Sequence, residues 1–197
     1  MFFTPAFNPF IIRKRLSRFL PYLCTMQTME LTDLIPSGFP DNAKVWIYQS
    51  SRAFIEKEEK EINEQLYQFY AQWQTHGAPV KGWAKLLFRQ FVVVLADETD
   101  ETVSGCSTDS SVRVIKSLER QYDVNFFDRM MITFLVKNKA EMLPFNQVQY
   151  AINKGFIDSN TLLFNNVVTT KKELLEKWLV PLKNSWLADR VSLPQVQ

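Results

Sequence analysis

The chain has 197 residues, a length that suits one domain of ordinary size. Apolar residues make up 46% and charged residues 22%, as in globular proteins, so we expect a substantial core. The two cysteines, Cys24 and Cys106, exclude a disulfide framework and favour a reducing cytoplasm. No uninterrupted apolar stretch reaches about 18 residues, so we expect no membrane span.

The net charge of +2 is unevenly distributed along the chain. Residues 1–28 contain basic residues and no acid: Arg13, Lys14, Arg15 and Arg18. The remaining residues, 29–197, include 19 basic and 21 acidic side chains, so their net charge is −2. This part of the chain therefore has no strongly basic field of the kind that nucleic-acid-binding proteins use, and we expect no nucleic-acid partner.

Residues 1–28 mix aromatic residues, prolines and a basic cluster, and we expect them to form an arm outside the domain. The charges stand in the middle of the arm, whereas a signal peptide carries them before its apolar stretch. Two interpretations stay open: a disordered or spurious extension, with translation starting at Met26 or Met29, and an interfacial amphipathic helix. We expect a single α+β domain at residues 29–190 and a tail at 191–197.

The first part of the domain shows a strand pattern and then a helix pattern. Residues 43–49 (AKVWIYQ) combine branched and aromatic residues in alternation, which predicts a strand. The charged run that follows has its apolar residues on one helical face: Ile55, Ile62, Leu66, Phe69 and Trp73. The segment His76-Gly77-Ala78-Pro79 is expected to end this helix.

The middle of the chain predicts a hairpin, a second helix and a further strand. Residues 82–88 and 90–96 are expected to pair, and the second of these is continuously apolar, as in a strand covered on both faces. The connection at Arg89-Gln90 lacks the residues of a favoured turn. The second helix is marked by its apolar positions: Val112, Ile115, Leu118 and Tyr122. Residues 130–136 then predict a fourth strand, followed by a turn and a short fifth strand.

The predicted order β-α-β-β-α-β is that of a ferredoxin-like fold, an antiparallel sheet with two helices on one face. A C-terminal β-α extension follows it. The extension begins with a short helix from about Asn146 to Gly155 and a strand at 161–166. Its last helix starts at Thr170, which forms a capping box with Glu173, and is expected to end at Pro181. The sequence therefore predicts an α+β fold with a ferredoxin-like core.

Several stretches resemble a known family: VWIYQS (45–50), WQTHG (73–77), DE (97–98), SGCSTDSSVR (104–113), FFDR (126–129), LFNNVVTTKKELLEKW (163–178) and PLKNSW (181–186). Together they are similar to small uncharacterised bacterial proteins often labelled "ABC transporter ATPase", over nearly all of residues 29–187. That label requires the phosphate-binding loop G-x-x-x-x-G-K-[ST], and no stretch of this chain completes the pattern. The resemblance thus implies membership of the family without ATP hydrolysis.

A polar segment that leads into the second helix holds most of the chemically interesting groups. Free amides at a helix N-terminus bind anions, and hydroxyls and a nearby guanidinium add donors. One interpretation is an anion or phosphate site formed by Ser107, Thr108, Asp109, Ser110 and Arg113. The alternative is an N-cap at Ser107 or Asp109, because these residue types are preferred there for structural reasons.

Cys106 is a candidate nucleophile, because a thiol at a helix N-terminus can have a lowered pKa. His76, the only histidine, is a candidate base for it. The alternatives are a cysteine packed under the helix and a histidine that binds the last carbonyls of the preceding helix. One histidine without a cysteine cluster predicts no zinc site. Asp97 and Glu98 could hold Mg²⁺ through their carboxylates, but acids at a strand end are usually solvated, so we expect no metal and no cofactor.

The sequence contains no complete catalytic triad, metal cluster or nucleotide loop, so we expect a non-enzymatic binding or regulatory module. A homodimer is one candidate assembly, by analogy with other ferredoxin-like sheets. The alternative is a small thiol-dependent enzyme or redox sensor that uses Cys106. Tryptophans are expected in the core, and an exposed one would mark a partner surface: Trp46, Trp73, Trp83, Trp178 and Trp186.

Overall fold

A computed structural model describes residues 31–75, 77–99 and 105–193, with the backbone alone at 105–108. The described residues cluster in one compact unit that begins at Leu31. The predicted arm at 1–28 and the last four residues of the predicted tail lie outside the described residues. The chain is a mixture of helices and antiparallel sheets, which confirms the α+β class.

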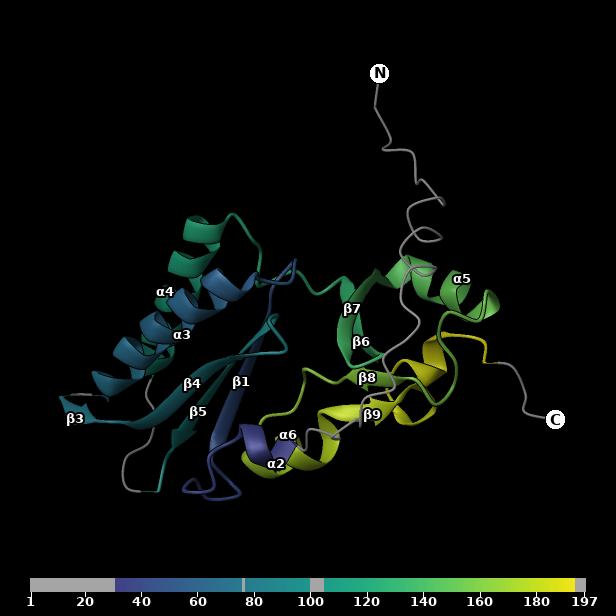
Figure 1. Ribbon diagram of the computed structural model, residues 1–197. Coiled ribbons are helices and arrows are strands. Elements are labelled where there is room, and N and C mark those ends of the chain that lie inside the picture. Colours follow the sequence, from purple (N-terminus) through teal and green to yellow (C-terminus); the bar gives the residue numbers. More distant parts are fainter. Residues whose placement is uncertain (1–30, 76, 100–104, 194–197) are drawn as a thin grey trace. The chain divides into compact units, whose positions relative to one another are not determined.

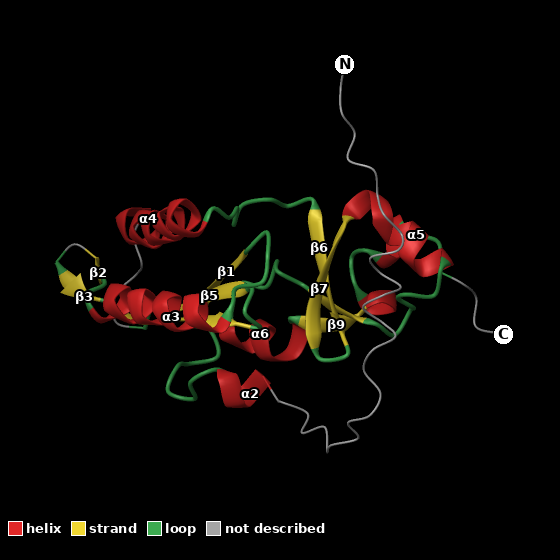
Figure 2. Cartoon of the chain, turned by 45° about the horizontal axis from the view of Figure 1, so that its top comes forward, coloured by secondary structure: helices red, strands yellow, loops and turns green. Residues whose placement is uncertain are grey.

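The first sheet has the strand order β1-β5-β4, with both pairs antiparallel. Its strands are β1 (Lys44–Gln49), β4 (Lys81–Leu87) and β5 (Phe91–Asp97). The two long helices are α3 (Glu56–Ala71) and α4 (Gly105–Tyr122). Figures 1 and 2 show both helices on one face of this sheet. The short pieces before and beside it are α2 (Leu31–Leu34), β2 (Gln74–Thr75) and β3 (Ala78–Pro79).

Strand β5 is buried on both faces, as its continuous apolar run predicts. Because side chains alternate along a strand, its residues divide between two cores. Val92, Val94 and Ala96 pack with α3 and α4. Phe91, Val93 and Leu95 pack on the opposite face, against residues from α2 and the C-terminal half of the chain.

The core on that opposite face is centred on an aromatic cluster formed by Phe88, Phe91, Phe164 and Trp178. The ring centroids of Phe91 and Phe164 are 4.5 Å apart and stacked. The Trp178 ring lies 5.3 Å from Phe164 and 5.4 Å from Phe91, in both cases edge to face. These contacts join the β4–β5 hairpin to β8 (Leu162–Phe164) and to the end of α6 (Lys171–Lys177).

The turn between β4 and β5 places two bulky residues in the left-handed region, Phe88 at φ 51° and Arg89 at φ 56°. This conformation costs about 1–2 kcal/mol per residue relative to the right-handed one. Two contacts offset it. The Phe88 ring packs in the aromatic cluster, and Arg89 Nε donates to the Phe54 carbonyl at 2.6 Å. Because these tertiary contacts stabilise the turn, it does not need the residues that favour such a turn locally, and the sequence contains none of them here.

The second sheet has the strand order β7-β6-β8-β9 and is antiparallel throughout. Besides β8, its strands are β6 (Met131–Val136), β7 (Lys139–Pro144) and β9 (Leu179–Pro181). Helix α5 (Val148–Asn153) shares a third core with β6 and β8, in which Phe134, Val148 and Leu163 are fully buried. Short 3₁₀ turns lie at Phe145–Gln147, Leu182–Asn184 and Ala188–Arg190.

The sequence prediction placed residues 130–136 in the first sheet, whereas the structure places β6 in the second. A ferredoxin-like sheet carries its fourth strand beside the first. Here β6 pairs with β7 on one edge and with β8 on the other, so both of its edges are occupied. Pairing with β8, which lies about 30 residues further along the chain, has no local signature in the sequence.

The C-terminal helix differs from the prediction at its end. Thr170 caps α6 as expected, since its hydroxyl accepts from Glu173 N–H at 3.2 Å. The Glu173 carboxylate accepts from Thr169 N–H, one residue before the cap. The helix ends at Lys177 and not at Pro181, because residues 179–181 form β9 and pair with β8.

We expect Phe164→Ala to lower the free energy of unfolding by about 3–5 kcal/mol, because the ring is buried and contacts three other rings. The matched control is Phe156→Ala, which removes an exposed ring and should change stability by less than about 0.5 kcal/mol. Urea unfolding followed by circular dichroism measures both. Equal midpoints for the two variants would contradict a central role for the cluster.

Candidate functional site

The predicted polar segment forms the start of α4, which begins at Gly105. Cys106 is the second residue of the helix, and its side chain, like those of Ser107 and Thr108, lies outside the described residues. His76 also lies outside them, so the proposed Cys106–His76 pair stays a prediction. The N-cap interpretation is wrong for Ser107 and Asp109, because both follow the first helical residue.

Two residues of the predicted anion site line a shallow cleft of about 400 Å³ between α3 and α4. Arg113 Nη2 donates to the Ser110 hydroxyl at 2.9 Å, and both side chains lie at the cleft. The other polar lining groups are the amides of Gln68, Gln72 and Gln74. Asp109 is exposed and does not line this cleft. Among the members of the predicted set whose side chains the structure describes, it therefore brings together Ser110 and Arg113.

A second and larger depression of about 470 Å³ lies where the two sheets meet, and we call it the inter-sheet groove. Four segments and one further residue line it: Ile47–Gln49 of β1, residues 126–129, Met131–Thr133 of β6, Phe164 with Asn166 and Val167, and Trp186. Its volume falls within the range of small-ligand pockets, which is about 300–1,000 Å³. No sequence motif marks the groove, because its walls come from segments up to 139 residues apart.

The polar part of the groove is built on the side chain of Gln49, which is 9% exposed. Its Nε2 donates to the Met131 carbonyl at 3.1 Å, and its Oε1 accepts from Asn166 Nδ2 at 2.9 Å. Asn166 Oδ1 in turn accepts from the indole N–H of Trp178 at 3.0 Å. These bonds fix both amides in place. The hydroxyl of Thr133, also in the lining, is buried without a hydrogen-bond partner among the described residues.

The apolar part of the groove is exposed to solvent. Phe127, Val167 and Trp186 line it with exposed fractions of 44%, 71% and 46%. Of the five tryptophans, Trp186 alone is exposed, while Trp73 and Trp178 are buried, as expected of core residues. Exposed apolar side chains that share one concave surface mark binding sites on soluble proteins.

Tyr48 forms one wall of the groove, and its ring meets the edge of Phe127 at a centroid distance of 5.8 Å. Burial raises the pKa of its phenol above the ordinary value of 10.0, while a hydrogen bond with Ser111 of α4 opposes the rise. Tyr48 is therefore neutral at physiological pH. The contact with Ser111 ties the groove wall to the helical layer.

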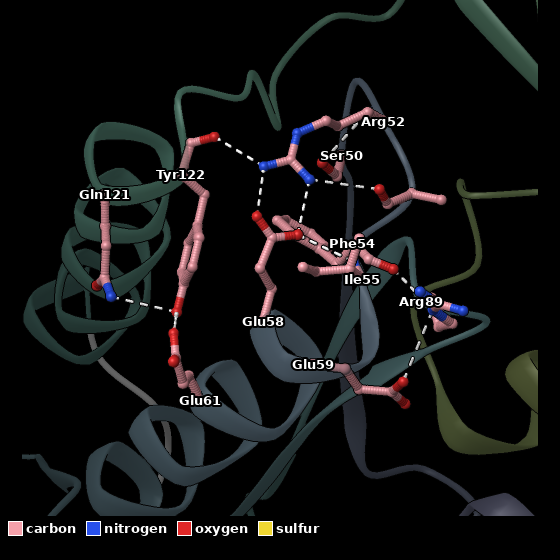
Figure 3. Close-up of polar contacts among 11 residues, drawn as sticks. Ser50, Arg52, Phe54, Ile55, Glu58, Glu59, Glu61, Arg89, Gln121 and Tyr122 are labelled. Atoms are coloured by element: carbon pink, nitrogen blue, oxygen red, sulfur yellow. Dashed lines mark hydrogen bonds and ion pairs between the residues drawn. The ribbon is translucent and has the colours of Figure 1, made fainter.

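A polar cluster at the start of α3 holds the loop that follows β1, as Figure 3 shows. The guanidinium of Arg52 donates to both carboxylate oxygens of Glu58, each at 2.8 Å, and to the carbonyl of Tyr122 at 3.0 Å. Glu58 also accepts from the Ile55 N–H at 2.9 Å, at the start of α3. Arg52 thus links the first turn of α3 to the last residue of α4.

The loop that this cluster holds is also hydrogen-bonded to Asn125, which precedes the groove residues 126–129. Ser51 N–H donates to the Asn125 carbonyl at 2.8 Å, and Asn125 N–H donates to the Ser51 hydroxyl at 3.0 Å. These two bonds fix the start of the segment that supplies Phe127 to the groove. The sequence showed the acids in the first turn of α3 but not the contact from Arg52 to the end of α4, because the Tyr122 carbonyl lies 70 residues from Arg52.

Neither a family model, a curated protein nor a solved structure matches this chain. The resemblance to the bacterial family stays a prediction. Within the described residues, no helix combines the length and apolarity that crossing a bilayer requires. In the same ranges, no group of three or more His, Cys, Asp or Glu side chains is placed to hold a metal ion.

Gly77 and Gly82 have the spacing of the two glycines in an ATP-binding loop, but Trp83 and Ala84 follow where that loop needs Lys and Ser or Thr. The two glycines have structural reasons here. Gly77 takes a φ of 86° in the turn between β2 and β3. Gly82 lies in β4 against the ring of Trp73, where an added Cβ would come within 2.5 Å. The segment joins strands, whereas a phosphate-binding loop joins a strand to a helix.

The Arg52–Glu58 contact predicts a specific pH dependence. Hydrogen bonds from Arg52 and from the Ile55 N–H lower the pKa of Glu58 from 4.5 to about 2. The folded state therefore binds this proton less readily than the unfolded state, so the contribution is present above pH 4.5 and is lost as the pH falls toward 2. Glu58→Gln should lower Tm at neutral pH and flatten its fall across this window.

Thermal melts between pH 7 and pH 2 measure this effect, with Glu56→Gln as the matched control. Glu56 stands in the same helical turn, but its carboxylate is exposed and pairs only with Lys60 among the described residues. The control should therefore keep the wild-type curve. If Glu58→Gln also follows the wild-type curve, the contact does not contribute to stability.

Proposed function

We propose that the domain is a non-enzymatic binding module and that the inter-sheet groove is its ligand site. One observation carries the proposal: a single depression combines exposed apolar side chains, Phe127, Val167 and Trp186, with amides already fixed by hydrogen bonds. Apolar area supplies most of the affinity of such a site, and a few oriented polar groups supply its selectivity. Because Gln49 and Asn166 are held in place before binding, little order is lost when a ligand arrives.

The chemistry of the lining supports recognition over catalysis. Its charged side chains, Asp128 and Arg129, are both exposed, and Asp128 Oδ1 already accepts from the Met130 N–H at 2.8 Å. The described lining contains no Cys or Lys that could act as a nucleophile. It also contains no His or Lys that could act as a base and activate the Thr133 hydroxyl. The groups present can contact a ligand and hydrogen-bond to it.

The location of the groove also supports the proposal. We propose that the first sheet is a ferredoxin-like core without its fourth strand, because β6, which would be that strand, pairs in the second sheet. The strand order β1-β5-β4, with α3 and α4 on one face, matches the first five elements of that fold. The groove then lies on the side of β1 that the fourth strand covers in a complete ferredoxin-like sheet.

Saturation-transfer NMR with benzamide and indole-3-carboxamide tests the site, since each probe pairs an aromatic ring with an amide. We expect both probes to bind wild-type protein. Val167→Glu should weaken their binding by about tenfold or more, because it places a carboxylate against the aromatic ring of the bound probe. The matched control, Ile55→Glu, changes another exposed apolar residue, which lies outside the groove, and should bind normally. Binding that survives Val167→Glu, or no binding at millimolar probe, would contradict the proposal.

A second candidate function rests on the position of Cys106, the second residue of α4. Free amides and the helix dipole stabilise a thiolate in the first turn, so a thiol-dependent enzyme or redox sensor is the alternative. Any anion that it uses would meet Ser110 and Arg113, the two predicted residues that share the α3–α4 cleft.

Cys24→Ser leaves Cys106 as the single cysteine and permits a direct test. Under this second candidate, the rate of reaction with a thiol reagent rises with pH about a midpoint below about 7. A midpoint at or above about 8.5, or no reaction of the folded protein, would exclude it. The same titration in urea gives the reactivity of the unfolded chain as a reference.

A further inference from the structure

We propose that the ligand of the inter-sheet groove is a short extended peptide segment that pairs through main-chain hydrogen bonds with the outer edge of β1. This inference rests on the proposed function and deepens it. Strand addition of this kind takes its affinity from the backbone and its selectivity from pockets for alternate side chains. Three features of the groove carry the inference: an open stretch of strand edge, the side chains that flank it, and the exposed guanidinium of Arg129 at the rim.

Strand β1 is the end strand of the first sheet, so one of its edges faces away from β5 (Figure 1). Residues that point to this outer edge are identified by their partners. Val45 N–H donates to the Thr169 carbonyl, and Lys171 N–H donates to the Ala43 carbonyl, both at 2.9 Å. Because N–H and C=O of a residue point to the same side of an antiparallel strand, the odd-numbered residues of β1 face outward.

The outer edge is paired at both ends of β1 and open between them. Beyond the strand, Ser51 N–H donates to the Asn125 carbonyl at 2.8 Å. Between Val45 and Ser51, the outward-facing residues are Ile47 and Gln49. Among the described residues, neither of them has a backbone partner on this edge. Both line the groove.

The size of this opening suits a peptide. A partner strand that exchanges hydrogen bonds with Ile47 and Gln49 needs about three residues in extended form. Such a segment continues the pairing that Thr169 and Asn125 already make on the same edge. Those two neighbours also limit the opening, so a long strand from a second copy of this chain would collide with them.

The flanking side chains indicate which peptide would bind. Successive side chains of an added strand point to opposite faces of the sheet. One set would meet Met131 of β6, and the other would meet Phe127 beside Tyr48. Arg129 is exposed at the rim and makes no ion pair among the described residues, so it complements an acidic residue or a free C-terminal carboxylate. We therefore expect a short apolar segment with an acidic end.

Selection of short random peptides from a display library, on the full chain, provides the ligand for the test. The selected peptides should bind wild-type protein and Ile55→Glu alike in calorimetry, and Val167→Glu about tenfold or more weakly. Hydrogen exchange of the complex should slow at the amides of Ile47 and Gln49. Selected peptides that leave these two amides unprotected, or a selection that yields no peptide dependent on Val167, would overturn the inference.

N-methylation of the selected peptide separates strand pairing from side-chain contact alone. Methyl groups at every second nitrogen, those facing β1, should each weaken binding about tenfold, while methyl groups at the intervening nitrogens should change it little. An equal response at all positions would overturn the strand model. If benzamide binds in the groove and no peptide does, the inference fails while the binding module stands. A dimer that forms through this edge in sedimentation would replace the peptide with a second copy.

Discussion

Burial of β5 on both faces is the constraint on which the rest of the structure depends. A strand with apolar side chains at every position needs a cover on each side, and this chain provides two different covers. Helices α3 and α4 form the first, and their apolar faces have the helical period. The second is assembled around Phe91, Phe164 and Trp178, and it draws the C-terminal half of the chain onto the sheet.

The second cover explains why an opening exists beside β1. Phe164 belongs to β8, and β8 pairs with β6, so packing of the aromatic cluster brings Leu135 of β6 against the core that the first sheet shares. In that position β6 does not pair with β1. The connecting residues Thr169–Lys171 pair with the start of β1, Asn125 bonds just beyond its end, and the groove remains between them. The same burial that stabilises the domain therefore creates its candidate binding site.

Polar groups at this junction are held by hydrogen bonds, most of them to residues far away in the chain. Gln49 is held by Met131 and Asn166, and Arg52 holds Glu58 and the end of α4. The buried Gln49 amide stabilises a single arrangement of the elements, because each lost bond leaves a buried group without a partner, and the half-buried Arg52 guanidinium adds further hydrogen bonds. This rigidity is what suits the groove to binding, since its walls are in place before a ligand arrives.

The sequence by itself determined the elements whose signals are local. Apolar periodicity predicted α3 and α4, alternation and an apolar run predicted β1 and β5, and Thr170 with Glu173 predicted the start of α6. Only the tertiary structure decided that β6 joins the second sheet, that residues 179–181 form a strand, and that Phe88 and Arg89 adopt a left-handed turn. These outcomes depend on pairing and packing between distant segments, and side-chain periodicity carries no information about such partners. The inter-sheet groove belongs to this second group, because its lining residues come from β1, residues 126–133, residues 164–167 and Trp186, which are far apart in the sequence.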